Sequence, residues 1–241
     1  MYDVLIIGAG PGGIFSAYEL IRQNPQFKVG VFEAGHELNR RKCPIDGKKI
    51  KTCIGCKTCQ VACKDRRDIQ VAGPRLRRVD TFECGTYPEV AMFHLNLSCN
   101  HCESPACVAN CPTGAMYKDD DGTVQHDDEA CIGCQTCVNS CPYGAPQFIE
   151  EDKIVQKCDT CRALREAGHE PVCVEACPLR ALSFGPVGEL RERYGGAADL
   201  PPLPDAAATA SNLVLTAPAC YEADPERIRA EGRVLNIREI V

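Results

Sequence analysis

Cysteine is the residue type in this sequence with the greatest capacity for chemistry, at 19 of 241 residues. Sixteen of these cysteines fall into four groups of four between residues 53 and 177. The groups are Cys53, Cys56, Cys59 and Cys63; Cys99, Cys102, Cys107 and Cys111; Cys131, Cys134, Cys137 and Cys141; and Cys158, Cys161, Cys173 and Cys177. Thiols at this density bind soft metals or pair as disulfides. The sequence therefore predicts metal centres or a disulfide scaffold.

The spacing within the groups favours iron-sulfur clusters. The first and third groups have the C-x2-C-x2-C-x3-C spacing of bacterial ferredoxins, and Pro112, Pro142 and Pro178 follow the last cysteine of the second, third and fourth groups. Three thiolates on one tight loop reach three irons of a cubane, but that loop does not bring a fourth thiolate to the far corner. The fourth ligand therefore comes from elsewhere in the chain. Four groups predict four 4Fe-4S clusters.

Two other interpretations of the cysteines are less favoured. A disulfide scaffold is typical of small secreted domains, but the N-terminus shows no secretion signal and the C-x2-C-x2-C thiols are too close together for pairing across a fold. Structural zinc suits C-x2-C pairs, but a third cysteine follows at cluster spacing in two groups. His101 lies inside the second group and is expected beside a cluster or at the surface, because all four cysteines of that group are present. Cys43, Cys84 and Cys220 stand outside the groups and are expected to be incidental thiols.

Internal repeats indicate how the protein positions these thiols. Residues 53–59 and 131–137 agree at six of seven positions, 78 residues apart, and residues 107–115 and 173–181 share the pattern C-V-x-x-C-P-x-x-A. Gly55 and Gly133, at the same position of the repeated loop, would let backbone amides approach a cluster. Residues 75–98 carry β-branched and aromatic residues on both sides of 85–88, which predicts a hairpin between two cysteine groups. The expected fold is α+β: a duplicated bacterial-ferredoxin-like iron-sulfur domain over 53–183 with this hairpin inserted, followed by an extended C-terminal tail over 184–241.

Composition narrows the class of protein. The formal charge of −6 does not favour a nucleic-acid partner, and no apolar run reaches the ~18 residues that span a bilayer. Only 44% of residues are apolar, cysteines included, so something other than aliphatic packing is expected to fill the interior. Lys57, Arg66 and Arg67 near the first group are interpreted as solvated surface charges, with cations that raise a cluster's potential as the alternative.

Residues 1–52 have a different pattern. A strand at 4–7, a helix at 14–22 and a strand at 29–32 predict a partial Rossmann-like βαβ unit. Gly8, Gly10 and Gly13 follow the first strand and Glu33 ends the second, which fits a dinucleotide-binding fingerprint for FAD or NAD. The segment resembles the start of a flavin-dependent dehydrogenase. Because no further parallel strands follow, a truncated fragment without a cofactor is favoured over a flavin-binding module.

Four segments resemble the four-cluster iron-sulfur subunits of the dimethyl sulfoxide reductase family of molybdopterin oxidoreductases. They read CIGCKTCQVACKD at 53–65, LSCNHC at 97–102, CIGCQTCVNSCPYGAPQ at 131–147 and CVEACPLRALSFGP at 173–186, and the resemblance covers 53–241. It implies that groups exchange ligands, the first with the fourth and the second with the third. The implied ligand sets are Cys53, Cys56, Cys59 and Cys177; Cys158, Cys161, Cys173 and Cys63; Cys99, Cys102, Cys107 and Cys141; and Cys131, Cys134, Cys137 and Cys111.

The resemblance also implies a function. The chain is expected to be a subunit without a catalytic site that relays electrons in anaerobic respiration. Its implied partners are an integral membrane quinol-interacting anchor and a molybdopterin-containing catalytic subunit. It would be associated with the membrane through these partners after assembly in the cytoplasm, where ligand thiols stay reduced. The alternatives are a flavin-linked iron-sulfur oxidoreductase that uses the N-terminal GxGxxG unit, and a soluble polyferredoxin without fixed partners.

Overall fold

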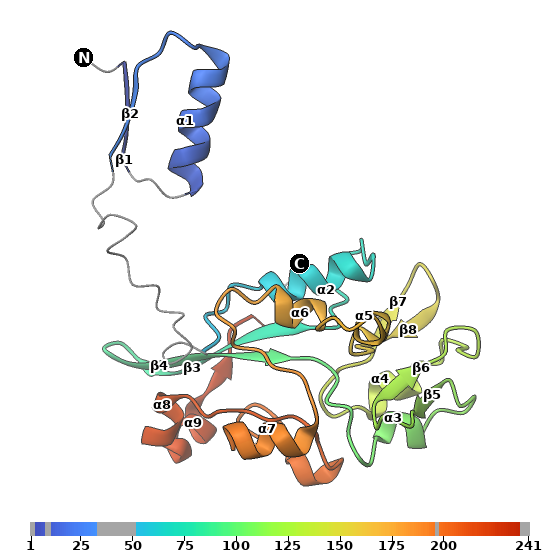
Figure 1. The fold of residues 1–241 in the computed structure, drawn as a ribbon. Helices are drawn as coiled ribbons and strands as arrows, with labels where there is room; N and C mark the ends of the chain where they lie inside the picture. The colour runs from blue at the N-terminus through green and yellow to red at the C-terminus, as the bar shows by residue number, and fades with distance from the viewer. Residues whose placement is uncertain (1–2, 8–10, 33–51, 196–197, 237–241) are drawn as a thin grey trace. The chain divides into compact units, whose positions relative to one another are not determined.

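The computed structural model describes residues 3–7, 11–32, 52–195 and 198–236 (Figure 1). The chain divides into two compact units, Met1–Lys48 and Lys49–Val241. The predicted domain limits at 52/53 and 183/184 remain predictions.

The first unit contains a βαβ arrangement, as the sequence predicts. Strands β1 (Val4–Ile7) and β2 (Val29–Phe32) pair in parallel, and helix α1 (Pro11–Gln23) connects them (Figure 1). Proline suits the first residue of a helix because that position needs no N–H donor. Leu5 and Phe15 are 61% and 68% exposed, so two strands and one helix leave apolar side chains uncovered. Of the predicted nucleotide-binding residues, Gly13 lies in α1, whereas Gly8, Gly10 and Glu33 lie outside the described residues.

An antiparallel hairpin forms the largest sheet of the second unit. Strands β3 (Arg78–Thr86) and β4 (Glu89–Leu97) pair along their full length, with Arg78 opposite Leu97 and Thr86 opposite Glu89. The predicted hairpin at 75–98 is therefore confirmed. A short strand β9 (Arg233–Val234) pairs with the other edge of β3, which gives the order β4-β3-β9.

Short elements carry the cysteines of the second unit. Two small antiparallel hairpins and several one-turn to two-turn helices alternate along the chain, a mixed α and β content. These elements are α2 (Thr58–Arg66), α3 (Ala106–Ala109), β5 (Met116–Lys118), β6 (Val124–His126), α4 (Thr136–Ser140), β7 (Gln147–Ile149), β8 (Ile154–Gln156), α5 (Arg162–Glu166) and α6 (Val172–Glu175). Helix α2 contacts α6, and α3 contacts α4. The first cysteine group therefore lies against the fourth, and the second against the third.

The C-terminal segment differs from the extended tail that the sequence predicts over 184–241. Its described part contains α7 (Val187–Tyr194), the 3-10 helix η2 (Ala206–Ala208), α8 (Ala219–Ala223) and α9 (Pro225–Glu231) before β9. The Asp224 side chain accepts a hydrogen bond from the Arg227 N–H, and Pro225 follows as the first helical residue, a strong helix start. Burial of Ile228 against β3 and β4 then holds α9 in place. The prediction of an extended tail is wrong for these helices.

The interior combines one apolar core with smaller cores in which ligand cysteines pack among apolar side chains. Phe82 and Phe93, whose ring centroids are 4.8 Å apart, pack with Leu95, Leu97 and Ile228 between the hairpin and α9. A second cluster contains Cys107 and Cys137 with three apolar residues, and another consists of Cys59, Val79 and Cys173. No helix in the described ranges is both long enough and apolar enough to cross a membrane.

Candidate metal centres

The repeated C-I-G-C loops turn at left-handed residues in the same two positions. In the first loop Gly55 and Lys57 have φ of +72° and +60°, and in the third group Gly133 and Gln135 have φ of +68° and +59°. A Cβ atom at Gly133 would lie 2.2 Å from the Lys153 carbonyl oxygen, so this loop needs glycine for space as well as for φ. These left-handed residues turn the chain ahead of α2 and α4. The third and fourth cysteines of each group then lie on or next to a helix.

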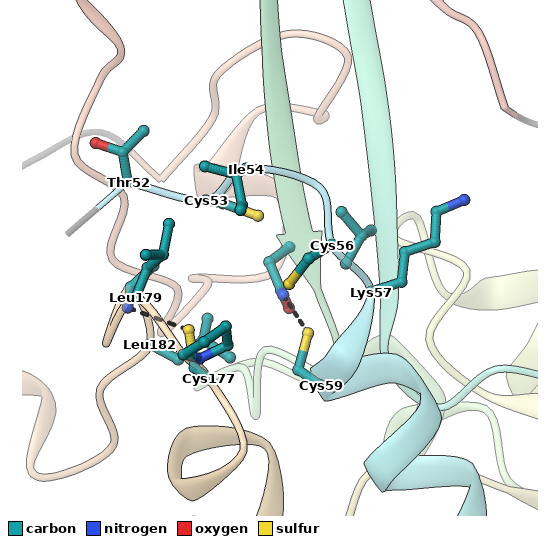
Figure 2. Close-up of a pocket in the computed structure, with 13 residues that line it drawn as sticks. Thr52, Cys53, Ile54, Cys56, Lys57, Cys59, Cys177, Leu179 and Leu182 are labelled. Atoms are coloured by element: carbon teal, nitrogen blue, oxygen red, sulfur yellow. Dashed lines mark hydrogen bonds between the residues drawn. The ribbon is translucent and has the colours of Figure 1, made fainter. Parts of the chain in front are cut away.

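One pocket brings together four thiols from distant parts of the chain. Cys53, Cys56 and Cys59 line it from the first loop and the start of α2, and Cys177 lines it from the loop after α6 (Figure 2). The pocket encloses about 330 Å³, including space open to solvent, and hydrophobic residues such as Leu182 complete its wall. These four cysteines, here called set A, are the four that the family resemblance groups together.

A second pocket has the same composition. Cys99, Cys102 and Cys107 of the second group line it together with Cys141 of the third group, and it encloses about 350 Å³, including space open to solvent. These four cysteines are called set C.

Electrostatic interactions between thiols show which of the other eight cysteines are neighbours. The Cys63 thiol interacts with those of Cys158, Cys161 and Cys173, which together form set B. The Cys137 thiol interacts with those of Cys111 and Cys131, and the Cys134 thiol also interacts with that of Cys111. Cys111, Cys131, Cys134 and Cys137 form set D. Each set thus combines three cysteines of one group with one cysteine of another.

The four sets adjoin one another in a fixed order. Cys59 of set A and Cys173 of set B lie in the same buried cluster with Val79. The Cys99 thiol of set C interacts with that of Cys158 of set B. Cys107 of set C and Cys137 of set D share another buried cluster. The order is therefore A, B, C and D.

Hydrogen-bond donors point at the sulfur atoms. The Asn96 side-chain amide donates to Cys59 Sγ at 2.7 Å, and the Thr209 hydroxyl donates to Cys102 Sγ at 3.2 Å. Backbone N–H groups donate to four further sulfurs at 3.3–3.5 Å: Gly55 to Cys53, Met116 to Cys111, Thr160 to Cys158 and Ala181 to Cys177. Such donors stabilise negative charge on sulfur and adjust the potential of a cluster.

Burial sets the protonation of the thiols in the absence of a metal. It raises the pKa of Cys63 and of Cys107 to about 12, and that of Cys137 to about 11. Hydrogen bonds from Thr136 instead lower the pKa of the exposed Cys134 thiol. A metal that binds the buried thiols must displace their protons.

The residues present fit iron-sulfur clusters. The sixteen grouped cysteines are all free thiols. In the described ranges, no three or more His, Cys, Asp or Glu side chains are arranged to hold a single metal ion. Asn100 lines the pocket of set C and is only 7% exposed, yet its side-chain N–H₂ group has no hydrogen-bond partner in the protein. Four thiols and an unused buried donor around one pocket suit a group that carries acceptor sulfides.

The remaining sequence-predicted residues lie outside the four sets. His101 is partly buried, its Nδ1 accepts a hydrogen bond from the Val124 N–H at 3.0 Å, and loss of solvent around the ring lowers its pKa to about 3, so it is a neutral neighbour of set C. Cys84 is buried in the apolar core and Cys220 packs against it, whereas Cys43 lies outside the described residues.

Arg66 and Arg67, two of the three basic residues near the first group, differ in their exposure to solvent. Arg66 is exposed, as the surface-charge interpretation predicts. Arg67 is instead partly buried and pairs with Asp159 at 3.3 Å. Sequence reasoning missed Asn96, Asn100, Arg77 and Lys157 altogether, because none of them contributes to the cysteine spacing.

Comparison with known protein families defines the class. A profile of 4Fe-4S dicluster domains matches residues 90–187, and a profile of 4Fe-4S binding domains matches residues 50–66. The chain is therefore an iron-sulfur protein with ferredoxin-like 4Fe-4S domains.

Individual relatives define the family within this class. The chain is 46% identical over 173 residues to the probable anaerobic dimethyl sulfoxide reductase chain YnfG of Escherichia coli, a match that covers 68% of this chain and 83% of the relative. It is 46% identical over 171 residues, with the same coverage, to another anaerobic dimethyl sulfoxide reductase chain of Escherichia coli. It is also 39% identical over 141 residues to the thiosulfate reductase electron transfer subunit PhsB of Salmonella typhi, covering 58% of this chain and 73% of the relative. The protein belongs to the family of dimethyl sulfoxide reductase iron-sulfur subunits, and it is an electron-transfer subunit, as the resemblance implies.

Proposed function

We propose that this protein holds four 4Fe-4S clusters, one in each of sets A, B, C and D, and passes electrons along them in that order. The main support is that four thiols meet in each set although they come from different cysteine groups. The contacts between A and B, B and C, and C and D support a single path. A chain with such a path acts as an electron relay. We therefore propose that it has no catalytic site of its own.

The protein's own part in this transfer is to hold, space and shield the clusters. Each bound cluster supplies a centre that takes up and releases one electron at a potential set by its surroundings. Val79 and Leu182 line the pocket of set A and give it an apolar wall. The amide donors to sulfur stabilise the more negative, reduced state. The fixed backbone loops keep the thiols in place, which limits rearrangement during transfer.

The two ends of the path reach the surface. Cys56 in set A and Cys134 in set D are exposed. The isoleucines at the same position of the repeated loops, Ile54 and Ile132, are 57% and 67% exposed. We propose that one end faces a molybdopterin-containing catalytic subunit and the other faces a membrane quinol-interacting anchor. The names of the dimethyl sulfoxide reductase relatives support such a complex, which would hold this chain at the membrane through its partners.

Metal analysis tests the cluster proposal. Protein purified without oxygen is expected to contain about sixteen irons and as much acid-labile sulfide, with four irons for each set. Low-temperature EPR of the dithionite-reduced protein is expected to show interacting cubane signals. Stoichiometric zinc with iron near zero would refute the proposal.

Isolation of the complex tests the partners. The chain, purified under mild detergent from cells that express it, is expected to bring down a large molybdenum-containing subunit and an integral membrane subunit. The isolated chain is expected to exchange electrons with a viologen dye but not to reduce dimethyl sulfoxide. Recovery of the chain without molybdenum, at full iron content, would favour a soluble polyferredoxin instead.

A further inference from the structure

A buried cation lies between sets A and B. Arg77 directly precedes β3, and its guanidinium group is buried although part of the residue is exposed. The guanidinium donates hydrogen bonds to Asn96 Oδ1 at 2.5 Å and to Ser98 Oγ at 2.9 Å. These bonds fix the cation in the interior beside the end of β4.

The electrostatic partners of Arg77 belong to two different sets. They are Cys59 of set A and Cys63, Cys158 and Cys173 of set B. Burial lowers the pKa of Arg77, but the charges of these sulfurs outweigh that effect and raise it. Asn96 completes the connection to set A, because it accepts from Arg77 and donates to Cys59 Sγ. One cation therefore faces two neighbouring sites at once.

A second buried cation lies next to set C. Lys157 is only 1% exposed, and its ammonium group donates to the carbonyl oxygens of Val124 and Cys158, at 2.7 Å for Cys158. Its charge acts on the thiols of Cys99 and Cys107. Because Lys157 precedes Cys158 of set B in the chain, it lies where sets B and C adjoin.

Neither residue has the environment of an ordinary structural cation. The adjacent Arg78 pairs with the Asp80 carboxylate at 2.9 Å, and Arg67 pairs with Asp159 at 3.3 Å. Arg77 and Lys157 bind neutral amide, hydroxyl and carbonyl oxygens instead, and their ionisable neighbours include cysteine thiols. A buried charge is costly unless an opposite charge compensates it. A cluster held by four thiolates supplies negative charge, and it gains one more negative charge on reduction.

We propose that Arg77 raises the reduction potentials of the clusters in sets A and B together, and that Lys157 raises the potential of the cluster in set C. The inference rests on the proposed binding of four clusters. The cations favour the reduced state because their attraction grows when a cluster gains an electron. In the interior this attraction is only weakly screened by solvent.

Replacement of Arg77 by glutamine tests the proposal in the full chain. EPR-monitored redox titration of Arg77→Gln at full iron content is expected to show two of the four midpoints lower than in the unchanged protein. A shift of about tenfold in the equilibrium constant for one-electron reduction is expected, which corresponds to 59 mV. Arg77→Lys keeps the positive charge, so its two midpoints are expected to stay close to those of the unchanged protein. In a Cys177→Ser background, which removes the 4Fe-4S cluster of set A or converts it to a three-iron form, only one 4Fe-4S midpoint is expected to shift.

Arg66→Gln is the matched control. Arg66 is also positively charged and acts on Cys161 of set B, but it is exposed, so solvent screens it. Its replacement is expected to change the equilibrium constant for one-electron reduction of the set B cluster less than twofold. Lys157→Gln is expected to lower the midpoint of set C and to leave those of sets A and D unchanged.

The outcomes separate this proposal from the proposed function. Absence of iron from the unchanged protein would refute the function itself. Full iron content in Arg77→Gln with all four midpoints unchanged, or with shifts no larger than those of Arg66→Gln, would overturn the role of Arg77. Loss of iron from Arg77→Gln would assign this residue a structural role and equally overturn it. The same criteria, applied to Lys157→Gln, decide the role of Lys157.

Discussion

At the scale of the residue, sulfur chemistry dominates the protein. The thiols of Cys107 and Cys137 take the place of aliphatic side chains in a buried cluster, which fits the small apolar fraction of the sequence. Burial raises the pKa of these thiols, so a metal that binds them must displace their protons. Each of the sixteen grouped thiols belongs to only one of the sets A to D.

Loss of a single exchanged ligand should therefore affect one set. Cys177→Ser is expected to lower the iron content from about sixteen toward about twelve or to convert one cluster to a three-iron form, because Cys177 completes the pocket of Cys53, Cys56 and Cys59. Iron analysis and EPR would measure the change. Cys220→Ser is the control, since Cys220 packs against the apolar core and is expected to leave the iron content unchanged. Equal iron in the two variants would contradict the assignment of Cys177.

At the scale of the element, the repeated loops have little freedom to vary. The left-handed residues ahead of α2 and α4 recur at the same places because the loop sequence recurs. The hairpin β3-β4 supplies Asn96 to set A on one side and buries Phe82 and Phe93 on the other. It connects the thiol-rich interior with the apolar core.

Substitution of the loop glycine should separate strain from steric overlap. Gly133→Ala is expected to disturb set D for two reasons. The new methyl group would overlap the Lys153 carbonyl oxygen, and a left-handed residue other than glycine costs roughly 1–2 kcal/mol. Gly114→Ala carries the same backbone cost at φ +74° but has no atom within 4 Å of the new Cβ. Denaturant unfolding and iron content are the measurements. The expected result is loss of iron only in Gly133→Ala, and equal behaviour would refute the steric argument.

Truncation in the apolar core should lower stability without removing iron. Phe82→Ala is expected to reduce the free energy of unfolding by roughly 3–5 kcal/mol, because Phe82 is 2% exposed and packs on Phe93 and Ile228. None of the sixteen grouped cysteines belongs to this cluster. Tyr87→Ala in the same hairpin, at 92% exposure, is expected to change stability by less than about 0.5 kcal/mol. Iron loss from folded Phe82→Ala would contradict this separation of the two interiors.

At the scale of the whole molecule, one chain carries two units of different character. The unit Lys49–Val241 contains all four sets, and Met1–Lys48 contains the βαβ arrangement. The relatives support an electron-transfer function for the chain, and they do not favour the flavin-linked alternative. We therefore expect the first unit to contribute no cofactor to the electron path.

Removal of the first unit tests this expectation. A shortened protein that starts at Lys49 is expected to keep about sixteen irons and unchanged midpoints, because its thiols lie within one compact unit. Visible absorption of the acid-extracted supernatant of the full chain is expected to show no flavin. Flavin in the full chain, together with its loss from the shorter one, would revive the flavin-linked oxidoreductase.

The sequence by itself determined the chemistry and much of the local structure. The spacing of Cys53, Cys56 and Cys59 defines a ligand loop without any tertiary information, since short-range geometry limits which metals such a loop can hold. The hairpin and the βαβ arrangement also followed from local patterns. The helical tail did not, because α9 depends on burial of Ile228 against strands more than a hundred residues earlier.

Only the tertiary structure brought together residues that share no sequence pattern. Spacing alone left open which group completes which set, and the family resemblance supplied that expectation; the structure places Cys177 with the first loop through the contact of α2 with α6. Arg77, Asn96 and Lys157 carry no motif, because electrostatic influence depends on distance and burial in space and not on separation along the chain. The thiols thus define what the protein binds, whereas the fold decides how the binding sites adjoin and which charges act on them.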